Sequence, residues 1–548
     1  MMTLRNRFFV RGFFALCSVV VVYLCFCGVP SVFWTLNAKA VDQIFIFRSG
    51  MASLSPSYDD RIIHVDLNDS SIQKLDNFYP NRKHFAQVVR NLSEMGAAAQ
   101  LFDFIFAAQT SDQDDGALID AVSDAGNVYF GMAFALQTGG PGSLRSEERR
   151  YLDKTLWRIS WKGSPGPLYA GRQPFPTYLD LAQASRGLGS ISVKPDLDGV
   201  FRRIPLLVRY RDGVYPSISL RAVCDYLQVP PEKIEVRPGK YILLKDADDP
   251  AADSVKDIAI PIDRRGNMII NFLGPWGSMK HYSFADVFGA SEKPSVMALW
   301  TDELVGKIAV VTNVSTGSTD IGPVTTDLTF PLSGLHSSAI HTILTGAFLK
   351  EVPPLAMLGI ELFLMLVVVT LSLRFSPILF SVTTTATAGV YFGAAAAAFL
   401  FAGVILNIAR PLLMVFLVFA AIQILTALEN ARRYAEAEKA KEMAEYDLEI
   451  GRKIQAGFFP DTLPAPEGWG LFAYFQAARQ VAGDFYDIFQ PGENRPIAIV
   501  VADVCDKGVG AALFMALIRS LLRSSTIQYY EEKAYHQGNS IPKRISSH

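Results

Sequence analysis

The chain has 548 residues, of which 50% are hydrophobic and 19% charged, and this apolar balance indicates membrane spans rather than an ordinary soluble protein. The formal net charge of −2 gives no basis for nucleic-acid binding. The chain has five cysteines, three of them within the first apolar segment, so a disulfide framework is excluded, and no C-x-x-C or His-rich tract predicts zinc.

The first apolar segment follows three arginines in residues 1–12 and runs without charge from Phe13 to Trp34. As a helix it would span roughly 30 Å, enough to cross the hydrocarbon core of a bilayer. The basic flank predicts that the N-terminus is cytoplasmic. Ala38-Lys-Ala40 resembles a signal-peptidase site, but the apolar run is long for a signal peptide, so we favour a retained anchor.

Residues 35–352 form a large region in which apolar strand patterns alternate with amphipathic helix patterns. This alternation predicts an α/β fold with a parallel sheet. The expected strands are 61–66, 98–103, 128–131 and 305–311, and the expected helices are 82–95 and 114–125, with a further helix opened by His336.

Four polar residues of this region are candidates for a binding pocket. Asp66 and Asp103 come at strand ends, where α/β sheets place ligand crevices, although a turn or helix-capping role is an equally good interpretation. His336 and His341 lie five residues apart in a helical pattern. They would contact a ligand or, as is more common for such histidines, pack in the interior.

Two motifs connect this region with a known family. The segment Asp196 to Arg202 reads D-x-D-G-V-x-R, and a closing G-x-H-x-x-A-I segment begins at Gly334. Together with the order of the strands, these motifs resemble the type-two CHASE domain over residues 40–349. The resemblance implies an extracytoplasmic sensor of bacterial receptors, and it does not name the stimulus.

Three more apolar segments follow in residues 353–428, at about 355–373, 377–402 and 412–428. With the first segment they predict four transmembrane helices. The basic residues Arg432, Arg433, Lys439 and Lys441 follow the last segment, which predicts that the chain returns to the cytoplasm of a bacterial inner membrane. Glu361 within the second span would face the helix bundle or mark a proton or ion path, but its position close to the outer interface favours snorkelling.

Residues 429–460 are rich in Ala, Glu and Lys and predict one long signalling helix that continues out of the membrane. Several apolar residues follow helical spacing without a clean heptad, so we expect a weak homodimer. The alternative is a solvated linker.

Residues 461–548 contain two separated acidic motifs. Asp484 follows a glycine and opens a short aromatic strand pattern, and Asp503 ends the apolar run Ile497–Val501, which we expect to be a buried strand before a helix at about 511–523. If the two strands pair, both carboxylates project toward one point. Such hard oxygen ligands suit Mg²⁺ or Mn²⁺.

The motifs V-A-G-D-F-Y-D (481–487) and A-D-V-x-x-K-G (502–508), with Ile454-Gln455 upstream, resemble the SpoIIE-like branch of the PPM-type serine/threonine phosphatases. The resemblance implies an α/β sandwich that binds two metal ions. It implies that Asp484, Asp503 and the carbonyl of Val504 are ligands and that the substrate is a phosphorylated regulator such as an anti-sigma-factor antagonist. Asp487 would be an outer-shell residue or an ordinary strand-end residue, and Arg479 a phosphate-binding or a solvated residue.

The chain departs from that family after Asp503, which only 45 residues follow, without the family's further metal-binding aspartates. We therefore expect residues 461–548 to be the N-terminal part of a phosphatase domain. Such a part would belong to a truncated product, need a complementing chain, or be inactive, so the assignment as an enzyme stays open. The alternative is a catalytically inactive receptor or a partner-binding protein.

Overall fold

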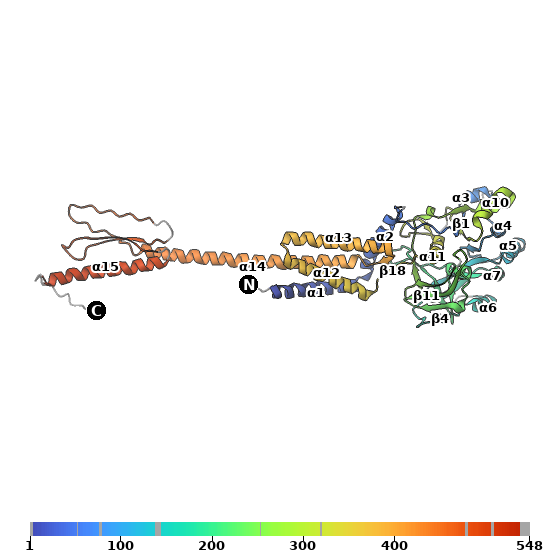
Figure 1. Ribbon diagram of the computed structural model, residues 1–548, viewed down its shortest axis with the longest axis horizontal. Helices are drawn as coiled ribbons and strands as arrows, with labels where there is room; N and C mark the ends of the chain where they lie inside the picture. Colours follow the sequence, from blue (N-terminus) through green and yellow to red (C-terminus); the bar gives the residue numbers. More distant parts are fainter. Residues whose placement is uncertain are drawn as a thin grey trace. The chain divides into compact units, whose positions relative to one another are not determined.

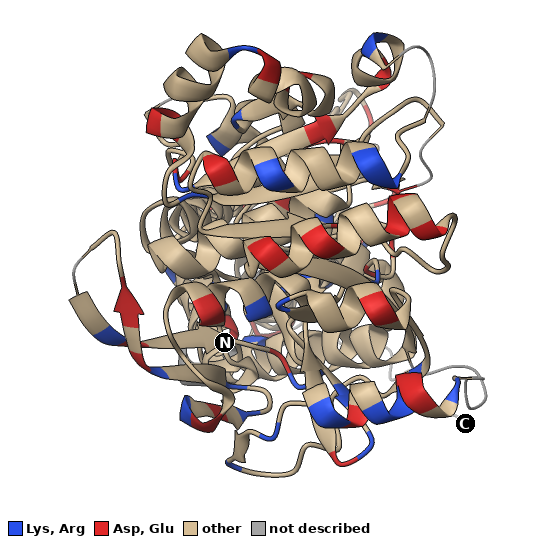
Figure 2. Cartoon of the chain, turned by 90° about the vertical axis from the view of Figure 1, so that its right-hand side faces the viewer, with Lys and Arg blue, Asp and Glu red and all other residues tan. Residues whose placement is uncertain are grey.

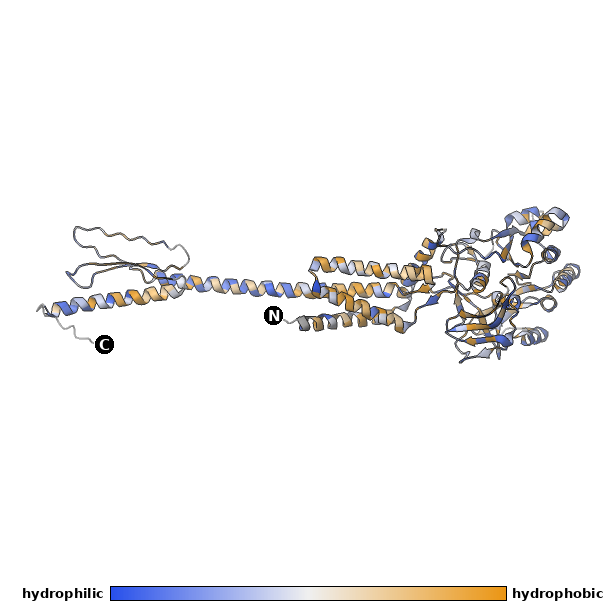
Figure 3. Cartoon of the chain, viewed as in Figure 1, coloured by the Kyte–Doolittle hydropathy of each residue, from blue (hydrophilic) through white to orange (hydrophobic). Residues whose placement is uncertain are grey.

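A computed structural model describes residues 4–51, 53–75, 79–136, 144–252, 254–317, 320–476, 481–505 and 509–536. The chain divides into two compact units, Met1–Ile422 and Gln423–His548. The first unit contains a mixed α/β region and a set of long apolar helices, which are drawn in Figure 1 and coloured by hydropathy in Figure 3.

A seven-stranded sheet forms the centre of the first unit, in the order β14-β1-β15-β2-β3-β5 with β6 also paired to β3. The strands are β1 (Ile62–Leu67), β2 (Ala99–Phe102), β3 (Val128–Leu136), β5 (Gly171–Pro176), β6 (Gly187–Ser190), β14 (His281–Ser283) and β15 (Ile308–Asn313). All pairs are parallel except β3 with β5. The predicted parallel α/β sheet is therefore confirmed.

Helices cover both faces of this sheet, which explains why every residue of β1 is buried. Helices α4 (Arg82–Glu94), α5 (Asp112–Ala125), α7 (Leu179–Ala184) and α9 (Phe284–Phe288) pack in one apolar cluster with Ile63 and Val65. Helices α8 (Ile218–Tyr226) and α11 (Ser333–Thr345) pack with Ile62 in another. The face of the sensor in Figure 2 shows basic and acidic residues interspersed over its helices.

The remaining sensor elements are shorter. A four-stranded sheet has the order β12-β11-β10-β4. Its strands are β4 (Ser160–Trp161), β10 (Ile234–Arg237), β11 (Tyr241–Asp249) and β12 (Ser254–Pro261). Two-stranded pairs are made by β7 (Arg203–Pro205) with β13 (Asn267–Ile269), β8 (Leu207–Tyr210) with β9 (Gly213–Pro216), β16 (Ile321–Gly322) with β17 (Phe330–Pro331), and β18 (Lys350–Glu351) with β19 (Val404–Ile405). The other helices are α3 (Asp69–Lys74), α6 (Ser146–Thr155) and α10 (Pro294–Leu304).

The apolar helices of the first unit pack against one another. They are α1 (Leu4–Gly28), α12 (Pro354–Arg374), α13 (Pro377–Ala402) and the start of α14 (Ala409–Ala456), and they share one apolar cluster. The expected first span, Phe13 to Trp34, falls on two helices, because the chain leaves helical geometry at Val29 before Pro30 and α2 (Pro30–Ser49) begins there. Among the described residues, five helices are long and apolar enough to cross a membrane, namely α1, α12, α13, α14 and α15.

The second unit contains the end of α14, the strands β20 (Asp484–Phe489) and β21 (Ala498–Asp503), and helix α15 (Val509–His536). The two strands form an antiparallel pair. The prediction that Ile497–Val501 is buried was wrong, since Ile499 is 61% and Val501 82% exposed. Among the described residues β21 pairs only with β20, and the exposed side chains of Ile499 and Val501 show that one face of the strand is uncovered. Helix α15 is also longer than the predicted 511–523.

Candidate functional site

The two predicted pocket aspartates of the sensor lie at the same edge of the main sheet. Asp66 is near the end of β1, and Asp103 directly follows β2, with β15 between the two strands. Because neighbouring strands are about 4.8 Å apart, the two backbones are separated by roughly 10 Å. The structure therefore places these aspartates at one edge without bringing them together.

Asp66 is buried and has a histidine partner that the sequence patterns did not indicate. Its Oδ2 lies 2.8 Å from Nδ1 of His281 on β14. The pairing of β14 with β1 sets His281 beside His64 and Ser283 beside Asp66. No local pattern predicts this arrangement, because the two strands come from distant parts of the chain.

Asp103 has a different environment. Burial, together with the nearby carboxylate of Asp320, raises the pKa of Asp103 to about 8. Burial also raises the pKa of Asp320. A protonated Asp103 carboxyl group would donate a hydrogen bond near neutral pH.

His336 and His341 of α11 are interior residues, with exposed fractions of 3% and 1%. Burial lowers the pKa of each to about 4, so both are neutral at neutral pH. Nδ1 of His341 accepts a hydrogen bond of 3.2 Å from the backbone N–H of Asp59. These contacts correspond to the packing interpretation.

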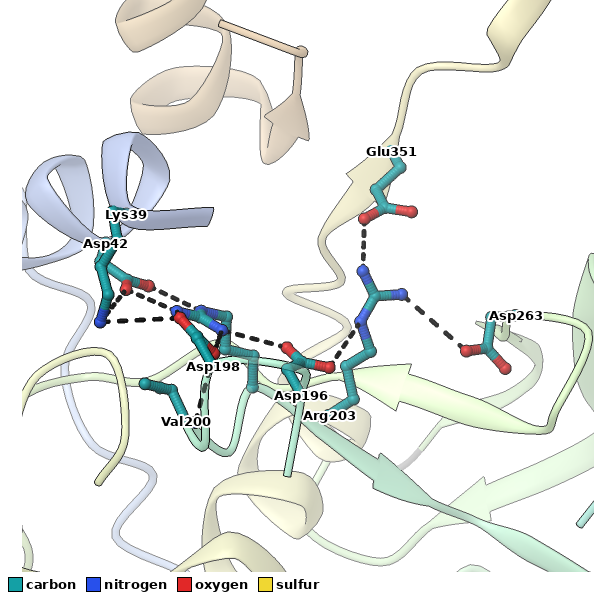
Figure 4. Close-up of polar contacts among 9 residues, drawn as sticks. Lys39, Asp42, Asp196, Asp198, Val200, Arg203, Asp263 and Glu351 are labelled. Atoms are coloured by element: carbon teal, nitrogen blue, oxygen red, sulfur yellow. Dashed lines mark hydrogen bonds and ion pairs between the residues drawn. The ribbon is translucent and has the colours of Figure 1, made fainter. Parts of the chain in front are cut away.

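The D-x-D-G-V-x-R motif forms a buried ion cluster, which we call the Arg202 cluster and which comprises Asp42, Asp196, Asp198 and Arg202 (Figure 4). Arg202 donates to both oxygens of Asp42 on α2 at 2.8 and 2.7 Å. It also donates to both oxygens of Asp198 at 2.8 and 2.7 Å and to Asp196 at 3.2 Å. All five guanidinium N–H donors are thus used, and the cluster fastens the motif loop to α2.

Arg203 extends this arrangement to a second connection. Its guanidinium lies 2.6 Å from Glu351 on β18 and 3.9 Å from Asp263 (Figure 4). Glu351 comes just before α12 and Asp42 lies on α2, which follows α1, so the motif contacts segments next to two apolar helices. An open pocket of about 650 Å³ lies beside Arg203 and is lined by groups of both charges, among them Lys194, Asp263, Arg264 and Arg410.

Glu361 of α12 faces the interior of the helix bundle. It is fully buried, and it accepts hydrogen bonds of 2.6 Å from Nε of Arg410 and from the hydroxyl of Tyr23. The snorkelling interpretation was therefore wrong. Arg410, which the sequence analysis did not single out, supplies the charge that makes a buried glutamate tolerable.

The second unit sets the two predicted metal ligands opposite each other. Asp484 at the start of β20 pairs with Asp503 at the end of β21, and both are exposed. Directly opposed residues of an antiparallel pair project to the same face, with Cβ atoms about 5 Å apart. Val504 continues the pairing, since its N–H donates to the carbonyl of Gly483 at 3.2 Å.

Asp487 lies on the other face of β20 from Asp484, because side chains alternate along a strand. It is 1% exposed and accepts hydrogen bonds from Arg523 at 2.6 and 2.7 Å, with Arg519 at 3.2 Å. Asp487 thus holds α15 on the sheet, which fits the structural rather than the outer-shell interpretation. Arg479 lies outside the described residues.

Gln455 fixes the segment before Asp484. Its amide donates to the carbonyl of Ala482 at 2.6 Å and accepts from the N–H of Ala482 at 3.1 Å. The end of α14 is therefore joined by two hydrogen bonds to the backbone two residues before Asp484. The sequence analysis had singled out Ile454-Gln455 as a motif piece without a physical role.

Comparison with known families gives one match that covers most of the chain: the CHASE2 domain, over residues 16–371. The chain belongs to the CHASE2 family. The predicted sensor is thereby confirmed, and the CHASE2 match includes the motif loop, the main sheet and the segment Pro354–Arg374 up to residue 371.

Two further comparisons concern individual proteins. Over 77 residues the chain is 57% identical to Protein IcfG of Synechocystis sp., and the match covers 14% of this chain and 12% of that protein. The chain thus spans only a small part of that curated relative. No solved structure matches the chain.

Proposed function

We propose that this protein is a membrane receptor whose CHASE2 sensor controls a metal-dependent serine/threonine phosphatase module, of which residues 461–548 are the N-terminal part. The CHASE2 domain indicates a signal-sensing receptor, and the apolar helices agree with a membrane protein. The observation that carries the phosphatase part is the register that sets Asp484 opposite Asp503 on one exposed face.

The donor set at this pair fits a hard divalent cation such as Mn²⁺ or Mg²⁺. Two opposed carboxylates are exposed and make no ion pair with another described residue, unlike Asp487, and the backbone carbonyl of Val504 is the next oxygen along the chain. These three residues would hold the metal, and Asp487 would keep β20 in place through α15. When bound, a pair of such ions supplies an activated water for phosphoester hydrolysis.

A continuous helix supports the proposed coupling. Helix α14 runs without interruption from Ala409, in an apolar segment, to Ala456, beside the hydrogen bonds of Gln455 with Ala482. A shift of this helix would be transmitted to the segment that carries Asp484. We propose that two copies of the receptor associate through this helix and that the substrate is a phosphorylated regulatory protein.

A second candidate is a receptor whose C-terminal unit binds a partner without catalysis. The exposed apolar side chains of Ile499 and Val501 favour this alternative, since such residues commonly lie in protein interfaces. In that case Asp484 and Asp503 would be ordinary surface residues.

Phosphatase activity of the full chain toward phosphoserine peptides, measured with and without Mn²⁺, tests the first candidate. The account predicts Mn²⁺-dependent hydrolysis that Asp503→Ala abolishes and that Asp461→Ala, at an exposed aspartate outside the pair, leaves intact. Metal-independent activity would reject the proposal. Lack of activity in a folded chain would favour the partner-binding candidate.

A further inference from the structure

The sensor contains a cluster of two imidazoles and a carboxylate at one edge of its main sheet. His64 and Asp66 are two residues apart on β1 and therefore project to the same face. The parallel pairing of β14 with β1 sets His281 beside His64. One potential metal-ligand atom from each of the three residues lies within 4.8 Å of the others.

Among the described residues, two buried polar atoms of this cluster have no hydrogen-bond partner, Nδ1 of His64 and Oδ1 of Asp66, and Nδ1 of His281 has only the 2.8 Å contact with Oδ2 of Asp66. His64 is fully buried and Asp66 is 6% exposed, so bulk water does not replace the missing hydrogen bonds of these atoms. Leaving a buried polar atom unpaired is costly, and two such atoms beside a third with a single contact point to a missing common partner.

The other ring nitrogens of both histidines are engaged. Nε2 of His281 lies 3.0 Å from the carbonyl of Trp276, and because a carbonyl only accepts, Nε2 carries the proton. Nε2 of His64 lies 3.1 Å from the hydroxyl of Tyr58. Metal-bound histidines commonly donate their outer N–H to a carbonyl or another polar group in this way, which leaves the inner nitrogen free to bind the ion.

We propose that His64, Asp66 and His281 bind one divalent transition-metal ion, with Zn²⁺ as the best match. Two imidazole nitrogens and one carboxylate form a ligand set that Zn²⁺ accepts, whereas Ca²⁺ and Mg²⁺ take oxygen ligands. Ligand atoms about 2.1 Å from a common tetrahedral ion lie roughly 3.4 Å from one another. The 2.8 Å between Asp66 Oδ2 and His281 Nδ1 is shorter than that spacing, so the two side chains would move slightly apart around an ion.

A simple ion pair between Asp66 and a protonated His281 explains less of the geometry. It would satisfy one oxygen of Asp66 and Nδ1 of His281, but Nδ1 of His64 and Oδ1 of Asp66 would remain unpaired. A bound ion accounts for all three residues together.

The surroundings allow an ion to enter. His281 is on the edge strand of the sheet, and its side chain is 23% exposed, whereas His64 lies behind it. The Trp276 ring packs 4.7 Å from that of His281 and 4.6 Å from that of His64, so the cluster is held between aromatic walls. Three protein ligands leave one position of a tetrahedral ion open to water or a small ligand.

This inference does not rest on the phosphatase assignment. It concerns the sensor of the first unit, and the ligand class differs from the hard cation expected at Asp484 and Asp503. The sensor would then respond to the availability of the ion or to a molecule bound at its open position.

Equilibrium Zn²⁺ binding to the detergent-purified full chain tests the proposal. The chain carries Asp503→Ala so that the C-terminal pair does not contribute, and it is first stripped with a chelator. We expect one Zn²⁺ per chain, and replacement by Co²⁺ should give visible absorption bands of a tetrahedral site. His281→Gln and Asp66→Asn should each weaken binding at least 100-fold, and Tyr58→Phe roughly 10-fold.

His84→Gln, at a partly exposed histidine of α4 outside the cluster, is the matched control and should bind like the parent chain. Thermal unfolding without metal shows whether each variant is folded. His281→Gln is the informative variant because it alters an edge strand rather than the core. Absence of stoichiometric Zn²⁺ binding in the folded parent chain, or equal affinity in folded His281→Gln, would overturn the proposal.

Discussion

Arg202 joins three carboxylates from two parts of the sensor, and its environment makes these bonds necessary. Burial alone would lower the pKa of Arg202, but its bonds with Asp42 and Asp198 raise it. Lys39 lies within 3.9 Å of Asp42 and 3.6 Å of Asp198 and shares part of their charge. The motif residues therefore stabilise the attachment of the loop to α2.

Replacing Arg202 by Gln should destabilise the sensor by about 3 kcal/mol, because Asp42 and Asp198 would be left buried without their main partner. Denaturant unfolding of the purified protein measures this. The matched control is Arg158→Gln, which removes an ion pair to Asp212 in which both side chains are exposed, and should change stability by less than about 0.5 kcal/mol. Equal effects of the two variants would contradict the role given to the Arg202 cluster.

Acid should destabilise the sensor through the histidines of α11. Burial lowers the pKa of His336 from its ordinary 6.5 to about 4 in the fold, so between these values the unfolded chain binds more protons than the native one. The stability from keeping His336 neutral is present above pH 6.5 and is lost as pH falls toward 4. His336→Gln should flatten this part of the stability profile, and an unchanged slope would contradict the assignment.

At the residue scale, the sequence predicted the positions of Asp484 and Asp503 because each follows from a local pattern, a glycine before one strand and a glycine-rich turn after the other. The sequence did not indicate His281 as the partner of Asp66, or Arg410 as the partner of Glu361. Both contacts depend on which strands or helices become neighbours, and no local spacing encodes that.

At the element scale, helix α15 is held on β20 through one buried carboxylate. Asp487→Asn should destabilise the second unit by about 2 to 3 kcal/mol, since Arg519 and Arg523 lose their charged partner. Because Asp487 projects away from Asp484, the affinity for Mn²⁺ should stay within about twofold in the folded variant. A loss of Mn²⁺ affinity without a loss of stability would favour the outer-shell interpretation. The control is Glu531→Gln on the exposed part of α15, which should change neither the stability nor the Mn²⁺ affinity.

Element types were predictable where periodicity was strong, as for β1, α4 and the helices α12 and α13. Burial was predicted less well. The apolar run before Asp503 is typical of a core strand, yet every second side chain of β21 is exposed. Burial of a strand depends on a second layer of structure, which the strand's own sequence does not specify. Helix α1 ends at Gly28 because Pro30 restricts the backbone of Val29 before it.

At the scale of the whole molecule, the basic flanks predict that the sensor and the C-terminal unit lie on opposite sides of the membrane. In a cysteine-free background, Ser291→Cys reports on the sensor and Ala440→Cys on the exposed part of α14. A membrane-impermeant maleimide applied to spheroplasts should label position 291 but not position 440, which should react only after lysis. Labelling of position 440 in intact spheroplasts would contradict the predicted topology.

The central claim is that Asp484 and Asp503 together bind a divalent cation. Mn²⁺ binding to the full chain, measured by electron paramagnetic resonance of the free ion, tests it most directly. We predict saturable binding that Asp484→Asn and Asp503→Asn each weaken at least tenfold, while Asp461→Asn has no effect. Equal Mn²⁺ affinity in the parent chain and in both folded pair variants would contradict the account.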